Sequence, residues 1–124
     1  MKITELKVLI CDDSILVRKK LKDLLKAAGI TEIYEAVDGQ KAVDLYKEHK
    51  PNLAFMDIVM PIKSGIDALV EIREYDPSAK VVMASTIGTQ NNLVSAIKAG
   101  AFEFLQKPIR EEDIFKVLNT FTKL

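Results

Sequence analysis

Five polar side chains of this 124-residue chain follow short apolar runs, and together they have the chemistry for phosphoryl transfer. They are the carboxylates of Asp12, Asp13 and Asp57, the hydroxyl of Ser85 and the ammonium of Lys107. Three carboxylates in one crevice would raise one another's pKa, and a hard cation such as Mg²⁺ removes that conflict. A lysine and a hydroxyl suit phosphoryl oxygens. Asp57 is the natural nucleophile, because a carboxylate can form an aspartyl-phosphate.

The segments that must position these side chains alternate between strand-like and helix-like patterns. Apolar runs predict strands over residues 7–11, 33–37, 53–57, 80–84 and 102–105, and apolar residues at helical spacing follow each strand. Five such units predict an α/β fold, a parallel sheet with helices on both faces. In open α/β sheets, ligands bind at the carboxyl ends of the strands, where the strand order reverses. We therefore expect the five polar side chains to meet at one edge of the sheet.

Charge and cysteine content exclude several classes of function. Lys plus Arg and Asp plus Glu both number 18, and this balance argues against binding to nucleic acid or to a membrane surface. The basic residues of segment 18–26, Arg18 among them, are expected to form a solvated helix face. The single cysteine, Cys11, is expected to be a buried thiol in a reducing compartment. With no recognisable signal peptide or membrane span, we expect a soluble, cytoplasmic protein with one domain, residues 1–124.

In this order and spacing, the residues resemble the receiver domain of two-component response regulators. The resemblance covers essentially the whole chain, is strongest to the stand-alone chemotaxis receivers, and extends to segment 83–88. It implies a flavodoxin-like, doubly wound sheet of five parallel strands in the order 2-1-3-4-5, with five helices. The motifs that carry it are Asp12-Asp13, Asp57 followed by Met60-Pro61 and Gly65, Ser85, and Lys107-Pro108.

The resemblance implies a role for each acid. Asp57 would accept a phosphoryl group from a histidine kinase. Asp13 and Asp57 would ligate Mg²⁺ directly, Asp12 would do so through water, and the backbone carbonyl of Val59 would be a further ligand. Such a receiver is not a conventional enzyme, because it catalyses only its own phosphorylation and dephosphorylation.

The same resemblance assigns the switch. Ser85 would bond a phosphoryl oxygen and move with it, and Lys107 would pair with the same group. Phe104 occupies the position of the switch aromatic, which changes rotamer as the hydroxyl moves. The peptide bond between Lys107 and Pro108 is expected to be cis, as in the family, although only about 5% of X–Pro bonds in folded proteins are.

Three positions depart from the commonest pattern of the family. Phe104 is not Tyr, so it has no phenolic hydroxyl for signalling. Thr86 stands where a small Ala is common, which narrows access to the phosphoryl site. Val59 is apolar and cannot position an attacking water through its side chain, so we expect it to affect the lifetime of the phosphoryl group.

Partner binding is expected on the last helices. The family uses the face formed by the fourth helix, the fifth strand and the fifth helix to meet a kinase, a target or a second receiver. Monomers, or weak dimers on phosphorylation, are expected, with a phosphatase as a further partner. The last helix carries an apolar stripe that is wider than a single buried face requires. It consists of Ile114, Phe115, Val117, Leu118 and Phe121.

Other interpretations fit less well. A haloacid-dehalogenase-type phosphatase needs two aspartates that flank one residue, whereas Asp12 and Asp13 are adjacent. A nucleotide-binding protein would need glycine in the first strand–helix turn, and residues 11–14 contain none. The chain could also be the receiver part of a longer regulator with an output domain. His49, near the end of the second helix, is expected to be a surface residue and not a phosphorelay histidine.

Overall fold

The computed structural model describes residues 2–86 and 90–122, in which five parallel strands alternate with five α-helices. The sheet order is β2-β1-β3-β4-β5, which confirms the predicted flavodoxin-like fold. The predicted second, fourth and fifth strands are each displaced by one residue, and residues 87–88 of the chemotaxis-like segment lie outside the described residues. The elements are η1 (Ile3–Glu5), β1 (Lys7–Cys11), α1 (Ile15–Ala27), β2 (Glu32–Ala36), α2 (Gly39–His49), β3 (Leu53–Asp57), α3 (Gly65–Tyr75), β4 (Val81–Ser85), α4 (Gln90–Lys98), β5 (Glu103–Gln106) and α5 (Glu111–Thr122).

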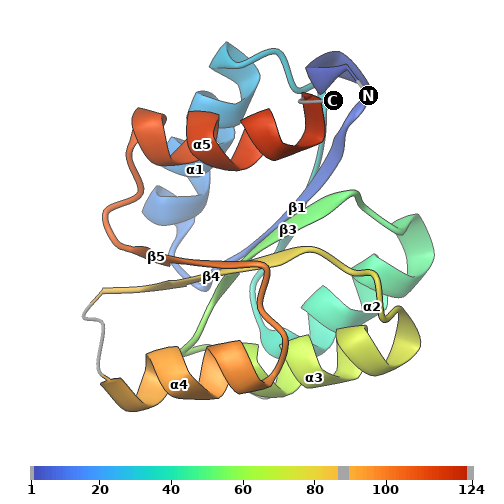
Figure 1. Ribbon diagram of the computed structural model, residues 1–124, viewed down its shortest axis with the longest axis vertical. Coiled ribbons are helices and arrows are strands. Elements are labelled where there is room, and N and C mark those ends of the chain that lie inside the picture. Colours follow the sequence, from blue (N-terminus) through green and yellow to red (C-terminus); the bar gives the residue numbers. More distant parts are fainter. Residues whose placement is uncertain (1, 87–89, 123–124) are drawn as a thin grey trace.

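The sheet separates two layers of helices (Figure 1). α1 and α5 pack on one face, and α2, α3 and α4 cover the other. In β3, Leu53 and Phe55 join the core under α1 and α5, whereas Ala54 and Met56 join the opposite core. None of these four residues is more than 2% exposed. The apolar run before Asp57 is continuous because successive side chains point to opposite faces and both faces are buried.

Polar caps set where the helices begin. The Oγ atom of Ser14 accepts a hydrogen bond from the backbone N–H of Val17, and Asp38 and Ser64 cap α2 and α3 in the same way. Because Ser14 caps α1, the pair Asp12-Asp13 lies in the turn between β1 and α1. The strand end and the helix cap together place these acids at the edge of the sheet.

Two glycines allow close backbone packing around the connection from β3 to α3. A Cβ atom on Gly65 would overlap the backbone oxygen of Asp57, and one on Gly39 would overlap the backbone oxygen of Lys63. The backbone N–H of Gly65 also donates to the carbonyl of Ile58 at 2.8 Å. Glycine therefore brings the first residue of α3 against the last residue of β3, next to the Asp57 carboxylate.

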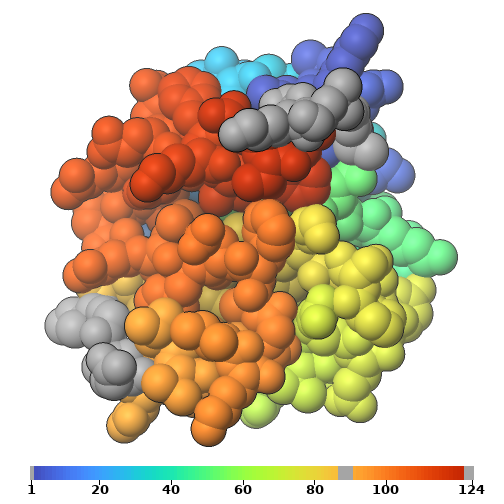
Figure 2. Space-filling model, in the orientation of Figure 1, coloured from blue at the N-terminus to red at the C-terminus, as the bar shows by residue number. Residues whose placement is uncertain are grey.

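Part of the apolar stripe on the last helix is exposed. Ile114, Val117 and Leu118 are at most 3% exposed and belong to the core, whereas Phe115 is 46% exposed. On α4, Ile97 is 63% exposed. Figure 2 shows α4, β5 and α5, coloured orange to red, as one continuous face of the molecule. The extra width of the stripe thus includes Phe115, on the face where partners were expected.

Two other expectations concern the surface. His49 is not simply solvated: its ring stacks on that of Tyr34 in the edge strand β2 at a centroid distance of 3.9 Å, and its side chain is 30% exposed. Among the described residues, none of the helices combines the length and the apolar character needed to cross a membrane.

Candidate functional site

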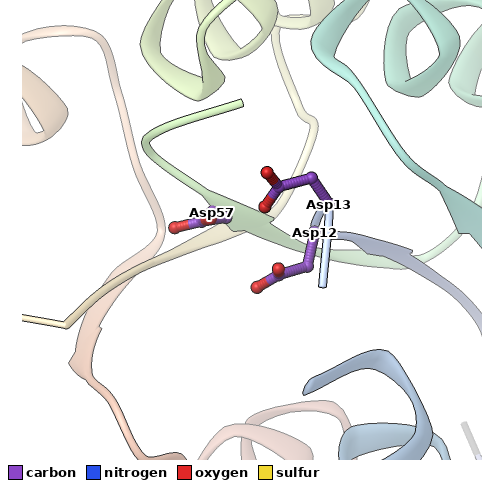
Figure 3. Close-up of side chains that lie close together, drawn as sticks. All are labelled: Asp12, Asp13 and Asp57. Atoms are coloured by element: carbon purple, nitrogen blue, oxygen red, sulfur yellow. The ribbon is translucent and has the colours of Figure 1, made fainter. Parts of the chain in front are cut away.

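The register of β1 against β3 brings the acidic residues together. Cys11 pairs with Met56, so Asp12 and Asp57, the next residue along each strand, are neighbours at the carboxyl end of the sheet. One oxygen from each of Asp12, Asp13 and Asp57 lies within 4.8 Å of the other two. Figure 3 shows the three carboxylates on the same side of the strand ends. The structure therefore brings together the three acids that the sequence singled out.

Lys107 reaches the same edge from the residues that follow β5. Its Nζ atom lies 2.6 Å from Oδ2 of Asp12 and 3.2 Å from Oδ1 of Asp57, and its side chain is 12% exposed. Its backbone N–H donates to the carbonyl of Ser85 at 2.7 Å, next to the pairing of β4 with β5. The peptide bond between Lys107 and Pro108 is cis, as predicted. One ammonium thus bridges two of the three carboxylates.

Burial and the charge of the partner act in opposite directions on the pKa values of Asp57 and Lys107. Burial raises the pKa of Asp57, the Lys107 ammonium counteracts it, and the Asp12 carboxylate reinforces it, so the pKa lies above the ordinary aspartate value. Burial lowers the pKa of Lys107, but the hydrogen bond to Asp12 and the charge of Asp57 outweigh it, so this pKa is raised. The Lys107 side chain is therefore a protonated ammonium at neutral pH.

Asp12 and Asp13 differ in how tightly they are held. Oδ1 of Asp12 accepts a hydrogen bond from the backbone N–H of Ser14 at 2.9 Å, Oδ2 accepts one from Lys107, and the residue is only 3% exposed. Asp13 is exposed, and across residues 2–86 and 90–122 its carboxylate makes no hydrogen bond or ion pair. Asp13 can therefore turn towards a ligand that arrives from solvent.

The remaining predicted site residues lie near the acids or on the neighbouring strands. Ser85 is the last residue of β4 and 7% exposed, and Thr86 after it is exposed. Phe104 of β5 is partly buried and packs against the core under α2, α3 and α4. Val59 follows β3 and is 75% exposed. The hydroxyl contact of Ser85, the rotamer change of Phe104 and the carbonyl ligand from Val59 stay predictions.

The donor set fits Mg²⁺. The three acids offer hard oxygen ligands, of which Mg²⁺ uses one or two together with water and phosphate oxygens. Lys107 neutralises only part of the negative charge, and Asp13 is open to solvent. The cluster is thus compatible with Mg²⁺ binding.

Arg18 contacts this site, although the basic residues of segment 18–26 predicted a solvated helix face. Its Nη1 atom donates to the backbone carbonyl of Asp12 at 2.8 Å, and its Nε atom lies 3.1 Å from Oε1 of Glu35. The side chain is 12% exposed, so the expectation was wrong for this residue. No local sequence signal marks it, because its partners come from β2 and from the end of β1.

The fold and the site together define a receiver domain. Residues 8–119 match the family of the response regulator receiver domain, and the chain belongs to that family.

The receiver is of the CheY-like kind. The chain is 44% identical to the chemotaxis protein CheY of Thermotoga maritima over 117 residues, which cover 94% of this chain and 98% of that protein. It is 40% identical to the protein CcdB of Bacillus subtilis over 113 residues, 91% of this chain and 94% of CcdB. A chain of the solved CheX–CheY–BeF₃–Mg²⁺ complex from Borrelia burgdorferi is similar in structure, with a TM-score of 0.88, 31% identity, and 96% and 90% of the two chains covered.

Proposed function

We propose that this chain accepts a phosphoryl group on Asp57 from a histidine kinase and thereby switches its binding to a target protein. The observation that carries the proposal is the ammonium of Lys107 between the carboxylates of Asp57 and Asp12, with Asp13 exposed beside them. This arrangement supplies a nucleophile, a positive charge for phosphoryl oxygens and oxygen ligands for a cation. In this proposal residues 1–124 form a single receiver domain, a signalling module that transforms no other molecule.

The proposed transfer forms one bond and breaks one. A carboxylate oxygen of Asp57 bonds to phosphorus while the P–N bond to the histidine of the kinase breaks, and the electron pair of that bond goes to the imidazole nitrogen. Asp57 becomes an acyl phosphate. Lys107 pairs with one phosphoryl oxygen and Ser85 donates a hydrogen bond to another. Attack of water on phosphorus later restores the Asp57 carboxylate and releases phosphate.

Asp12, Asp13, Asp57 and the backbone carbonyl of Val59 would hold Mg²⁺, with Asp12 acting through water. When bound, Mg²⁺ supplies positive charge against the carboxylates and the phosphoryl oxygens. The open Asp13 carboxylate and the incomplete neutralisation by Lys107 support this assignment. The related complex from Borrelia burgdorferi contains BeF₃ and Mg²⁺ by its name, which also supports it.

The proposed output surface is the face of α4, β5 and α5. It carries the exposed apolar side chains of Val94, Ile97 and Phe115, at 39%, 63% and 46% exposure. The CheY relatives favour a chemotaxis partner, such as a motor-switch protein or a CheX-like protein, and the CcdB relative leaves other signalling outputs in view. A phosphatase is a further proposed partner. The cytoplasmic location, the absence of nucleic-acid and membrane binding, and the monomer or weak dimer state stay predictions.

Phosphorylation with a small-molecule donor tests the proposal. The protein is incubated with acetyl phosphate with and without Mg²⁺, and acid-labile phosphate is located by mass spectrometry. We expect one phosphate on Asp57 that requires Mg²⁺ and is absent in Asp57→Asn. Asp23→Asn, which changes an exposed acid of α1, is the matched control and should be modified like the wild type. Lack of modification, or modification that survives Asp57→Asn, contradicts the proposal.

Membership of the receiver family disfavours the haloacid-dehalogenase-type alternative. A related 40% identical segment lies in a protein-glutamate methylesterase/protein-glutamine glutaminase of Methanococcus maripaludis, of which the match covers 29%. Receivers therefore also occur within longer proteins, and the interpretation of the chain as the receiver of a longer regulator stays alongside the stand-alone one.

A further inference from the structure

We infer that Arg18 is a positioning residue for the cation site, because it fixes the peptide plane that joins Asp12 to Asp13. The inference rests on the proposed function, since it concerns how this chain would hold Mg²⁺. Arg18 lies on α1 and touches neither the Asp12 carboxylate nor that of Asp13 through any hydrogen bond within the described residues.

The carbonyl that Arg18 binds belongs to the peptide group between the two acids. A peptide group is planar, so a bond that holds the Asp12 carbonyl oxygen also sets the direction of the Asp13 N–H and of the bond to the Asp13 Cα. The Asp13 carboxylate has no hydrogen bond or ion pair of its own in the described part of the chain. The side chain can rotate, so the backbone sets the point from which the carboxylate reaches the site, and Nη1 of Arg18, 2.8 Å from that carbonyl oxygen, is a side-chain donor that holds this backbone.

Arg18 is itself held from the opposite side. Its Nε atom lies 3.1 Å from Oε1 of Glu35 on β2, and Glu35 also pairs with Lys22 of α1 at 3.0 Å. These two cations lower the pKa of Glu35, with the hydrogen bond from Lys22 as the largest cause, so Glu35 is ionised at neutral pH. The rigid guanidinium fork can serve Glu35 and the Asp12 carbonyl at once, which a lysine ammonium on the same stem cannot do with the same geometry.

The pair Arg18 and Lys22 offers a matched comparison. Both cations lie on α1 and pair with Glu35, but only Arg18 contacts the backbone of Asp12. Loss of either removes one positive charge and one ion pair with Glu35. A loss of Mg²⁺ affinity in Arg18→Ala that Lys22→Ala does not share is assigned to the contact with the Asp12 carbonyl, because removal of a nearby positive charge by itself would strengthen Mg²⁺ binding.

The test measures Mg²⁺ affinity without any phosphoryl donor. The ¹H–¹⁵N NMR spectra of the wild type, Arg18→Ala, Arg18→Lys and Lys22→Ala are titrated with Mg²⁺, and the spectra confirm that each variant is folded. We expect the dissociation constant to rise about tenfold in Arg18→Ala, the usual size for loss of a group that orients a ligand, and to change less than about twofold in Lys22→Ala. Without Mg²⁺, the Asp13 amide signal should shift more in Arg18→Ala than in Lys22→Ala.

The outcomes separate this inference from the proposed function. If the wild type binds Mg²⁺ and both Arg18 variants bind it within about twofold of the wild type, only the role of Arg18 is overturned. An equal loss in Lys22→Ala would assign the effect to the ion pairs that both residues form with Glu35 and overturn the inference as well, because loss of a positive charge by itself would strengthen Mg²⁺ binding. If the wild type binds no Mg²⁺, the proposed function and the inference both fail. If the Arg18→Ala variant is unfolded, Arg18→Lys takes its place in the comparison with Lys22→Ala.

Discussion

At the scale of single residues, Asp57 combines an electrostatic cost with its proposed reactivity. The carboxylate is largely buried and lies beside two other acids, and its pKa is raised mainly by burial. A raised pKa means that the folded state holds the ionised form less well than the unfolded state does. The site therefore carries unrelieved negative charge in the absence of a cation, which is the property that would attract Mg²⁺.

The first residue-scale prediction is that Asp57→Asn stabilises the metal-free protein. At pH 7 the substitution removes the destabilising charge, so the free energy of unfolding should rise by about 1 kcal/mol, the common size of a point-mutation effect. As the pH falls below the raised pKa of Asp57, the wild type becomes protonated and recovers that stability, so the gain should shrink by pH 3. Urea unfolding at pH 7 and pH 3 with chelator present measures both differences.

Asp23→Asn is the control, because Asp23 is an exposed acid whose ion pair with Lys19 contributes little. Its stability should stay within about 0.5 kcal/mol of the wild type. A gain for Asp57→Asn that does not change with pH, or a loss of stability at pH 7, would show that the carboxylate is not under electrostatic strain.

At the scale of secondary-structure elements, the site depends on how α3 begins. The register of β1 with β3 aligns Asp12 with Asp57, and the close approach of Gly65 places the start of α3 against the Asp57 backbone. The Lys63 side chain, near the α3 end of the loop between β3 and α3, forms an ion pair with Glu71 of α3. The carboxylate is thus positioned by the strand, and its surroundings by the helix that follows.

Gly65→Ala tests this packing. The added Cβ atom would overlap the backbone oxygen of Asp57, which cannot move without the strand, so we expect a loss of about 1–3 kcal/mol, as for other overpacked sites. Chemical denaturation measures the loss, and Val70→Ala, at a 40% exposed position of the same helix, should cost less than about 0.5 kcal/mol. A Gly65→Ala protein as stable as the wild type would mean that the close approach imposes no constraint.

At the scale of the whole molecule, the candidate site and the proposed output face are distinct regions joined by β4 and β5. Ser85 ends β4, and Phe104 lies in β5, the strand that runs between α4 and α5 (Figure 1). The hydrogen bond from the backbone N–H of Lys107 to the carbonyl of Ser85 links the ends of these two strands. In the proposed function, a change at the candidate site would reach the face that carries Phe115 through the ends of β4 and β5.

Phe115→Glu should separate folding from partner binding. Because Phe115 is 46% exposed, the free energy of unfolding should change by less than about 0.5 kcal/mol. Binding of the beryllofluoride-treated protein to a chemotaxis motor or kinase component that captures the wild type should weaken at least about tenfold, as expected for an aromatic residue at the centre of an interface. Surface plasmon resonance measures this affinity.

Tyr75→Glu serves as the control and should bind like the wild type, because Tyr75 is an aromatic residue of α3, 44% exposed, whose ring lies against Tyr46 and Lys47 of α2 and away from the output face. If Phe115→Glu binds as tightly as the wild type, the target uses another surface. If both variants weaken binding equally, the effect reflects net charge and not the α4, β5 and α5 face.

The sequence by itself determined the alternation of strands and helices, the order of the acidic, hydroxyl and lysine motifs, and the sheet edge at which they would meet. These features follow from local patterns, because strand ends and apolar periodicity are written in neighbouring residues. CheY is among the proteins already known to obey the rule that ligands bind at these strand ends. The rule is therefore expected to hold for a receiver.

Only the tertiary structure decided which side chains touch. Lys107 bridges Asp12 and Asp57, and it lies 95 positions from Asp12 in the sequence. Arg18 contacts the site through the backbone carbonyl of Asp12. The stack of His49 on Tyr34 likewise depends on where α2 lies against β2. Such contacts depend on strand register, helix placement and side-chain reach, which the packing of the whole chain sets and no short stretch of sequence contains.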